Sequence, residues 1–254
     1  MGVYTRRMIS LSTFLFLATL PAAAAASAAP VPSDPPLVAA VKKGDLHGLQ
    51  AALASGADVG AKDQYGWTAA MWAAGHGSGA MLRVILKAGG SVASGVAPGY
   101  NAMVEAAKGD KPDVVTELAA NGFDCGAKDA QGVPALAYAT ANVSTGTVAA
   151  LLACKADVNA GDANGFTPLI RAVQNGQPSA VAFLLAHGAR VNARDHRGYT
   201  ALMWAAHDGA TGAAKALLAA NADPAIKGQD ELTAYAIAKA RGRTAVAALL
   251  PATP

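Results

Sequence analysis

The chain has 254 residues, of which 53% are hydrophobic and 15% charged, and its formal net charge is +3. This composition excludes disordered and collagen-like chains, which are poorer in apolar residues or carry glycine at every third position. Without the two arginines of the first 29 residues, the chain has 18 basic and 17 acidic residues. The sequence therefore predicts no basic surface for nucleic acid.

Residues 1–29 have the features of a secretory signal peptide. Arg6 and Arg7 supply positive charge, Met8–Leu20 is apolar, and Ala22–Ala29 offers several A-x-A cleavage sites. An uncleaved membrane anchor is the alternative, but Pro21 and the weak hydrophobicity of alanine argue against a span.

This leader places the mature chain outside the cytoplasm. We expect a monomer in a bacterial periplasm, with no membrane contact after cleavage; secretion from the cell is the alternative. A twin-arginine signal over residues 5–10 is a weaker interpretation of the same segment.

Residues 30–36 form a stiff linker of proline and small residues. From residue 33 onward, the landmarks of the sequence recur every 33 residues, which predicts a repeat architecture. The predicted units are 33–65 (the N-terminal cap), 66–98, 99–131, 132–164, 165–197, 198–230 and 231–254 (the C-terminal cap). Glycine opens five of them: Gly66, Gly99, Gly132, Gly165 and Gly198.

The segment Gly165–Arg197 shows best what one unit contains. Thr167 and Pro168 predict a helix start, and Gly176–Pro178 predicts a turn before a second helix. Gly188 predicts a left-handed end to that helix, followed by an extended arm.

Two positions of the unit predict the shared core. Alanine occupies the eighth position throughout, where only a methyl group fits between neighbouring helices: Ala40, Ala73, Ala106, Ala139, Ala172, Ala205 and Ala238. The twentieth position is apolar throughout: Ala52, Ile85, Leu118, Leu151, Leu184, Leu217 and Leu250.

This period, with GFTPL at Gly165–Leu169 and GARVNARD at Gly188–Asp195, resembles the ankyrin repeat. The resemblance covers residues 33–254, with further copies in GADVGAKD at Gly56–Asp63 and KADVNAGD at Lys155–Asp162. It implies an all-α repeat solenoid of helix-turn-helix units joined by extended hairpin arms. The chain departs from the pattern at the histidine that usually follows T-P-L, which is Ile170 here.

The unit 132–164 departs most from the pattern. Pro134 replaces the capping threonine, and Lys155 stands where the helix-ending glycine is expected. A lysine in the left-handed conformation costs about 1 to 2 kcal/mol. We expect local opening of the array to begin in this unit.

Two cysteines, Cys125 and Cys154, make a disulfide possible in an exported protein. Their places in the repeat do not require the sulfurs to meet, so one buried apolar cysteine and one free thiol are the favoured interpretation. Histidines are scattered and show no metal-ligand spacing, which predicts no metal and no cofactor. A small hydrolytic or metal site made of His196, His207 and Asp208 is the least favoured alternative. The repeated aspartates are expected to hydrogen-bond the arm turns: Asp63, Asp129, Asp162 and Asp195.

Aromatic residues suggest where a partner binds. The resemblance implies that the second position of the unit and the arm tip before it line the concave face on which ankyrin proteins hold partners. The predicted partner-binding residues are Tyr65, Trp67, Tyr100, Phe166, His196, Arg197, Tyr199, His207 and Asp208. Packing of the rings against neighbouring loops is the alternative. The seventh position varies in chemistry, as a recognition surface does: Trp72, Glu105, Tyr138, Arg171 and Trp204. Trp72 and Trp204 occur within T-A-x-M-W-A-A, which resembles a common ankyrin variant, so a place in the core is the alternative for these two.

The sequence therefore predicts a non-enzymatic scaffold or adaptor that binds a protein or peptide outside the cytoplasm. A secreted effector that binds a host protein is the alternative.

Overall fold

The computed structural model describes residues 33–92, 101–142 and 145–252. The predicted signal peptide, the start of the linker and Tyr100 lie outside these ranges. By its contacts the chain divides into Met1–Ser33 and Asp34–Pro254, and the helices below all belong to the second part.

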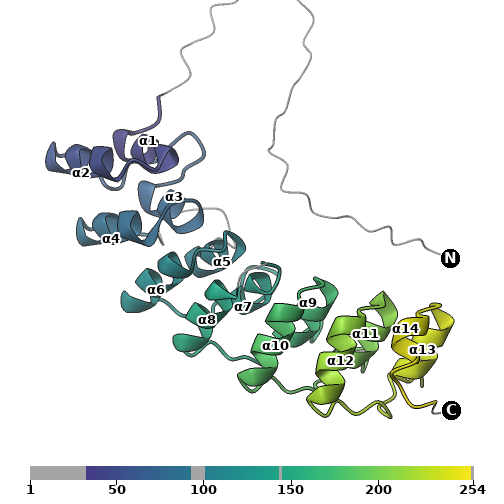
Figure 1. Cartoon of the computed structure of the whole chain (residues 1–254). Coiled ribbons are helices and arrows are strands. Elements are labelled where there is room, and N and C mark those ends of the chain that lie inside the picture. The colour runs from purple at the N-terminus through teal and green to yellow at the C-terminus, as the bar shows by residue number, and fades with distance from the viewer. Residues whose placement is uncertain (1–32, 93–100, 143–144, 253–254) are drawn as a thin grey trace, which may run out of the picture. The chain divides into compact units, whose positions relative to one another are not determined.

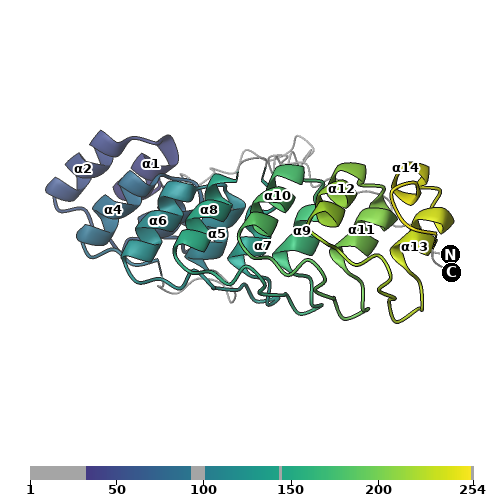
Figure 2. The same ribbon diagram turned by 60° about the horizontal axis from the view of Figure 1, so that its bottom comes forward.

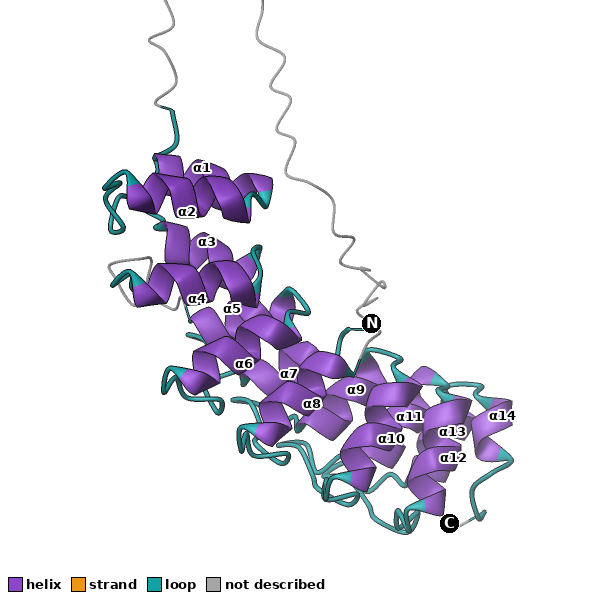
Figure 3. Ribbon diagram, turned by 60° about the vertical axis from the view of Figure 1, so that its left-hand side comes forward, coloured by secondary structure: helices purple, strands orange, loops and turns teal. Residues whose placement is uncertain are grey.

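The described residues form fourteen helices joined by loops, without a strand (Figure 3). The first helices of successive units are α1 (Pro36–Lys43), α3 (Ala69–Gly75), α5 (Ala102–Lys108), α7 (Ala135–Ala139), α9 (Pro168–Gln174), α11 (Ala201–Asp208) and α13 (Ala234–Ala240). The second helices are α2 (Leu46–Ala54), α4 (Gly79–Lys87), α6 (Pro112–Ala120), α8 (Gly146–Ala153), α10 (Pro178–Ala186), α12 (Thr211–Ala219) and α14 (Thr244–Ala247). The predicted all-α repeat solenoid is confirmed.

The described helices include none that is both long and apolar enough to cross a lipid bilayer.

Helix pairs follow one another in chain order, and each first helix packs against the next first helix (Figure 1). Second helices stack in the same way, with one exception. α8 packs closely against α6, but it has far fewer contacts with α10. A unit therefore contacts chiefly its two neighbours, as in other repeat arrays.

Capping residues fix where the first helices begin. The hydroxyl of Thr167 accepts a 3.3 Å hydrogen bond from the backbone N–H of Ile170, and Pro168 occupies the first helical position, both as predicted. Three further first helices are capped by threonines through the same contact: Thr68, Thr200 and Thr233. Asn101 caps α5. In contrast, Pro134 provides no side-chain cap to α7, which has only five residues.

The core lies between the two layers of helices. Every alanine of the eighth position is buried, and from Ile85 to Leu250 so is every residue of the twentieth position. Ala52 in the first unit is only partly buried. The predicted helix register is therefore correct in the units that have neighbours on both sides.

The backbone is left-handed wherever the sequence expects a helix-ending glycine. Gly188 has φ 85°, and Lys155 takes the same conformation with φ 69°, as predicted from the sequence. Asn221, with φ 62°, is the equivalent residue of the unit 198–230. A side chain at a left-handed position contacts its own backbone, so the lysine stores local strain.

The expectation of free cysteines is wrong. Cys125 and Cys154 form a disulfide, with an S–S distance of 2.02 Å and a Cα–Cα distance of 6.1 Å. Cys125 lies in the arm of the unit 99–131, and Cys154 ends α8 in the next unit. Stacking brings the arm of one unit beside the helix end of the next, which the position of each cysteine in its own unit does not reveal.

Where the structure describes the connections between units, they are extended arms, and Figure 2 shows their loops along one edge of the helices. Short antiparallel bridges close three of the arms: Lys62 with Thr68, Lys128 with Pro134, and Arg194 with Thr200. Neighbouring arms are tied together, because the backbone N–H of His196 donates to the carbonyl of Asn164 at 3.0 Å.

Candidate functional site

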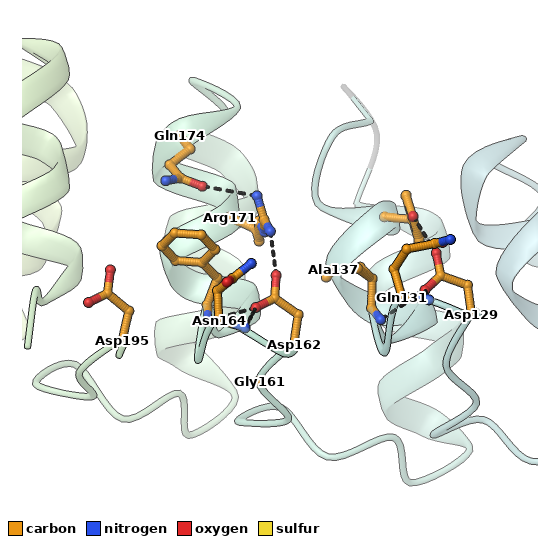
Figure 4. Close-up of polar contacts among 12 residues, drawn as sticks. Asp129, Gln131, Ala137, Gly161, Asp162, Asn164, Arg171, Gln174 and Asp195 are labelled. Atoms are coloured by element: carbon orange, nitrogen blue, oxygen red, sulfur yellow. Dashed lines mark hydrogen bonds and ion pairs between the residues drawn. The ribbon is translucent and has the colours of Figure 1, made fainter. Parts of the chain in front are cut away.

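An aspartate organises four of the arm turns, and the buried Asp162 shows the pattern in Figure 4. Its Oδ1 accepts hydrogen bonds from the backbone N–H of Asn164 at 2.8 Å and of Phe166 at 3.1 Å. Its Oδ2 accepts from the guanidinium of Arg171. Three further turns have the same pattern, with acceptors Asp63, Asp129 and Asp195. The predicted role of these aspartates in the turns is borne out by these contacts.

The seventh position supplies the donor to the second carboxylate oxygen. The indole N–H of Trp72 donates to Asp63 at 2.8 Å, and the hydroxyl of Tyr138 donates to Asp129 at 2.5 Å. Arg171 and Trp204 do the same for Asp162 and Asp195.

Four of the five residues at this position therefore have a structural role in the turn, and whether they also contact a partner stays a prediction. Their chemistry varies, but each ends in an N–H or O–H donor that reaches the aspartate nine residues earlier. Glu105 has no donor, and the residue nine places before it is Val96 instead of aspartate. A search for donors nine residues after each aspartate finds this relationship in the sequence.

These contacts keep the turn carboxylates charged. Burial raises the pKa of Asp162, but the Arg171 guanidinium and the two backbone N–H donors outweigh it and hold the pKa below its usual range. The pKa values of Asp63 and Asp129 are lowered in the same way, against the effect of burial, by backbone and side-chain donors. Burial and the bond to Asp129 raise the pKa of the Tyr138 hydroxyl to about 12.

The aspartate turn fixes the backbone of the last residue of the unit. The N–H of this residue is one of the two backbone groups that donate to Oδ1 of the aspartate. We call these last residues the tip row: Tyr65, Gln131, Asn164, Arg197 and Asp230, all exposed. Asp230 belongs to the row by position, since Gly228 replaces the turn aspartate of its unit. Tyr65 has 68% of its surface exposed. The tip row therefore shows different side chains to the solvent on one repeated backbone frame.

The aromatic second position is less exposed than expected. Trp67 and Phe166 are partly buried. Tyr199 is only 5% exposed, and its hydroxyl donates to Asp230 at 2.5 Å, so the expectation of an accessible ring there is wrong. Its ring lies 5.7 Å from that of Trp204 and belongs to the core between two units. Tyr100 lies outside the described residues.

Cations of the chain itself cover the rings near the tips. The guanidinium of Arg197 lies 4.7 Å from the ring centroid of Tyr199 and 5.9 Å from that of Trp204. Three more rings are covered: Trp72 by Lys42, Tyr138 by Lys108 and Phe166 by Arg171. These three cations also pair with carboxylates, whereas Arg197 pairs with none of the described ones. Arg197 is thus an exposed cation held in place by two rings.

The histidines of the least favoured alternative have separate surroundings. His196 is exposed at an arm tip, where it lines an open hollow of about 610 Å³ together with Arg194 and Lys227. His207 contacts Asp208 at 2.8 Å from Nδ1 to Oδ1 and lies 5.3 Å from the Trp204 ring. Within the described ranges, three or more His, Cys, Asp or Glu side chains nowhere gather as a metal ion requires.

Repeated helix pairs, left-handed glycines and hydrogen-bonded arm turns define an ankyrin-type repeat protein. A family model described as ankyrin repeats (3 copies) matches residues 37–129 and 102–195. A second, described as ankyrin repeats (many copies), matches residues 184–238. The chain belongs to the ankyrin repeat family. A comparison with curated proteins finds no match. Ankyrin repeats are modules of protein–protein interaction and are typically non-enzymatic.

Proposed function

We propose that the chain is a non-enzymatic scaffold that acts outside the cytoplasm, in a bacterial periplasm, and holds a protein partner through its arm tips and first helices. The tip row carries this proposal. Its backbone is fixed by one repeated set of hydrogen bonds, while its side chains change from Tyr65 to Gln131 to Arg197. Recognition of one particular partner requires side chains that differ from unit to unit on a backbone that repeats the same conformation.

Two members of the tip row have the properties of binding anchors. Tyr65 offers a large exposed ring, and Arg197 offers a guanidinium already ordered by the rings of Tyr199 and Trp204. Tyrosine and arginine dominate binding energy at protein interfaces because they desolvate much surface with few rotatable bonds. These anchors lie four units apart, so a partner that contacts both is an extended segment or a protein surface.

Export is supported by two features. Residues 1–29 carry the charge, apolar run and alanine-rich end of a signal peptide. The Cys125–Cys154 bridge is of a kind that persists in oxidising compartments outside the cytoplasm. Mass spectrometry of the exported protein tests this part, and a mature chain that retains Met1 would contradict it.

Partner capture tests the surface. Purified mature protein is used to capture partners from periplasmic extract, and the affinity of the captured protein is then measured for each variant. We expect Tyr65→Ala and Arg197→Ala each to weaken binding by about 1 to 3 kcal/mol while leaving the unfolding curve unchanged.

The matched control is Lys215→Glu, an exposed change on the second-helix side. Arg83→Glu is unsuitable as a control, because Arg83 pairs with the buried Glu117 at 2.7 Å. Loss of binding in Lys215→Glu, with binding retained in both tip variants, would assign the surface to the opposite side.

A further inference from the structure

The disulfide is a covalent tie between two units of the array. Cys125 follows α6 in the third unit, Cys154 ends α8 in the fourth, and 29 residues separate them. In a repeat array each unit is held mainly by its two neighbours, so a covalent tie to one neighbour matters most for a unit whose helices pack loosely against the other.

The unit 132–164 is the weakly held one. α7 is the shortest first helix, with five residues, and neither Pro134 nor Thr145 gives a side-chain cap to the helix it precedes. Lys155 is left-handed directly after the bridged Cys154. The disulfide therefore holds the residue next to the strained one.

The two sides of this unit are held differently. Towards the third unit, the hydroxyl of Thr147 donates to Asp110 at 2.6 Å, and the disulfide adds a covalent link. Towards the fifth unit, α8 and α10 approach each other less closely than other second helices do. Hydrogen bonds join the fourth and fifth units, such as Asn175 Nδ2 to Thr140 Oγ1 at 3.3 Å and the backbone N–H of His196 to the Asn164 carbonyl at 3.0 Å.

The two bridged cysteines differ in exposure. Cys125 is 6% exposed, whereas Cys154 is partly exposed at the end of its helix. Cys154 is therefore the more exposed residue of the bridge.

We propose that the Cys125–Cys154 bridge is a redox-modification site, and that its reduction by a dithiol opens the unit 132–164 and separates the array into 33–131 and 165–254. One thiolate of the dithiol attacks the sulfur of Cys154, the S–S bond breaks, and Cys125 leaves as a thiolate. The second thiolate of the dithiol then attacks the mixed disulfide and releases Cys154. The dithiol is oxidised to a disulfide, the protein gains two electrons, and two protons end on the cysteine sulfurs. This inference does not depend on the proposed partner.

Hydrogen exchange of the folded protein, with and without dithiothreitol, tests the proposal. Mass spectrometry after alkylation confirms complete reduction. We expect the amides of α7 and α8 to exchange on the order of 100-fold faster after reduction, since the cross-link no longer restricts the open state. Exchange in α3, α4, α11 and α12 should change less than about twofold.

Two variants serve as controls. The double variant Cys125→Ser/Cys154→Ser should exchange like the reduced protein and should not respond to dithiothreitol. Lys155→Gly, measured in the reduced protein, should restore protection by roughly fivefold, because glycine adopts the left-handed conformation without strain.

Unchanged protection of residues 135–153 after complete reduction would overturn the proposal. Resistance of the folded protein to dithiothreitol, or equally faster exchange in all units, would also overturn it. Each of these measurements can be made on the unaltered chain, so a double variant that does not fold leaves the test intact.

Discussion

The indole N–H of Trp204 donates a 2.9 Å hydrogen bond to the second carboxylate oxygen of Asp195. The aspartate belongs to the arm that ends one unit, and the tryptophan belongs to the first helix of the next. The other oxygen of Asp195 accepts the backbone N–H groups of Arg197 and Tyr199. One carboxylate thus connects the arm tip, the turn and the following helix.

Removal of this carboxylate should destabilise the array. We expect Asp195→Ala to lower the free energy of unfolding by about 2 to 4 kcal/mol, because a buried turn loses three hydrogen bonds and its donors lose their acceptor. Urea denaturation measures the change. Asp208→Ala removes an exposed carboxylate of equal charge and should stay within about 0.5 kcal/mol of the parent chain. Equal effects of the two changes would mean that charge, and not the turn, accounts for the loss.

Stability should fall in acid because the turn aspartates have lowered pKa values. A carboxyl group whose folded pKa lies below its unfolded value of about 3.9 stabilises the fold above that value and loses this effect as pH falls through the folded pKa. Asp63, Asp129 and Asp162 are groups of this kind. We therefore expect the urea midpoint to be steady from about pH 7 to 5 and to drop progressively below about pH 4. Asp162→Asn should show a shallower drop, and an identical pH profile would argue against a charged Asp162 in the turn.

Lys155→Gly should stabilise the oxidised chain. Lys155 has φ 69° at a position where four other units carry glycine. The substitution therefore relieves about 1 kcal/mol of strain, from which the conformational entropy that glycine adds to the unfolded chain must be subtracted. Asn221→Gly is the matched comparison, since Asn221 has φ 62° and asparagine tolerates this conformation better. The thermal midpoint should rise more for Lys155→Gly than for Asn221→Gly; the reverse order would exclude strain as the cause.

Tyr199 should behave as a core residue. Tyr199→Phe removes only the hydroxyl that donates to Asp230 and should cost about 1 kcal/mol. Tyr199→Ala also removes a buried ring and should cost about 3 to 5 kcal/mol. Tyr65→Ala, at the exposed tip, should leave the denaturation midpoint within experimental error. Similar midpoints for Tyr199→Ala and the parent chain would show that the ring is not part of the core.

The sequence was sufficient for features set within one unit. Thr167 and Pro168 begin a helix through contacts with the next few residues, and the left-handed Lys155 follows from the register of the repeat alone. The Cys125–Cys154 bridge depends instead on how consecutive units stack, whereas the Trp204–Asp195 bond follows a nine-residue spacing that is present in the sequence. Stacking also buries Tyr199, although an aromatic residue in the same position of another unit stays partly exposed. The position in the repeat therefore predicted backbone conformation better than exposure.

The hydrogen bond between a turn aspartate and the following first helix determines where repeats can be exchanged between two ankyrin chains without loss of that bond. Gly66 and Gly198 mark the period, yet a chimera joined at either glycine would take Asp63 or Asp195 from one parent and its donor from the other. A join placed just before the aspartate keeps Asp63 with Trp72, or Asp195 with Trp204, in a single transferred segment. The interchangeable part of this protein therefore begins at the arm aspartate, three residues ahead of the glycine that the repeat suggests.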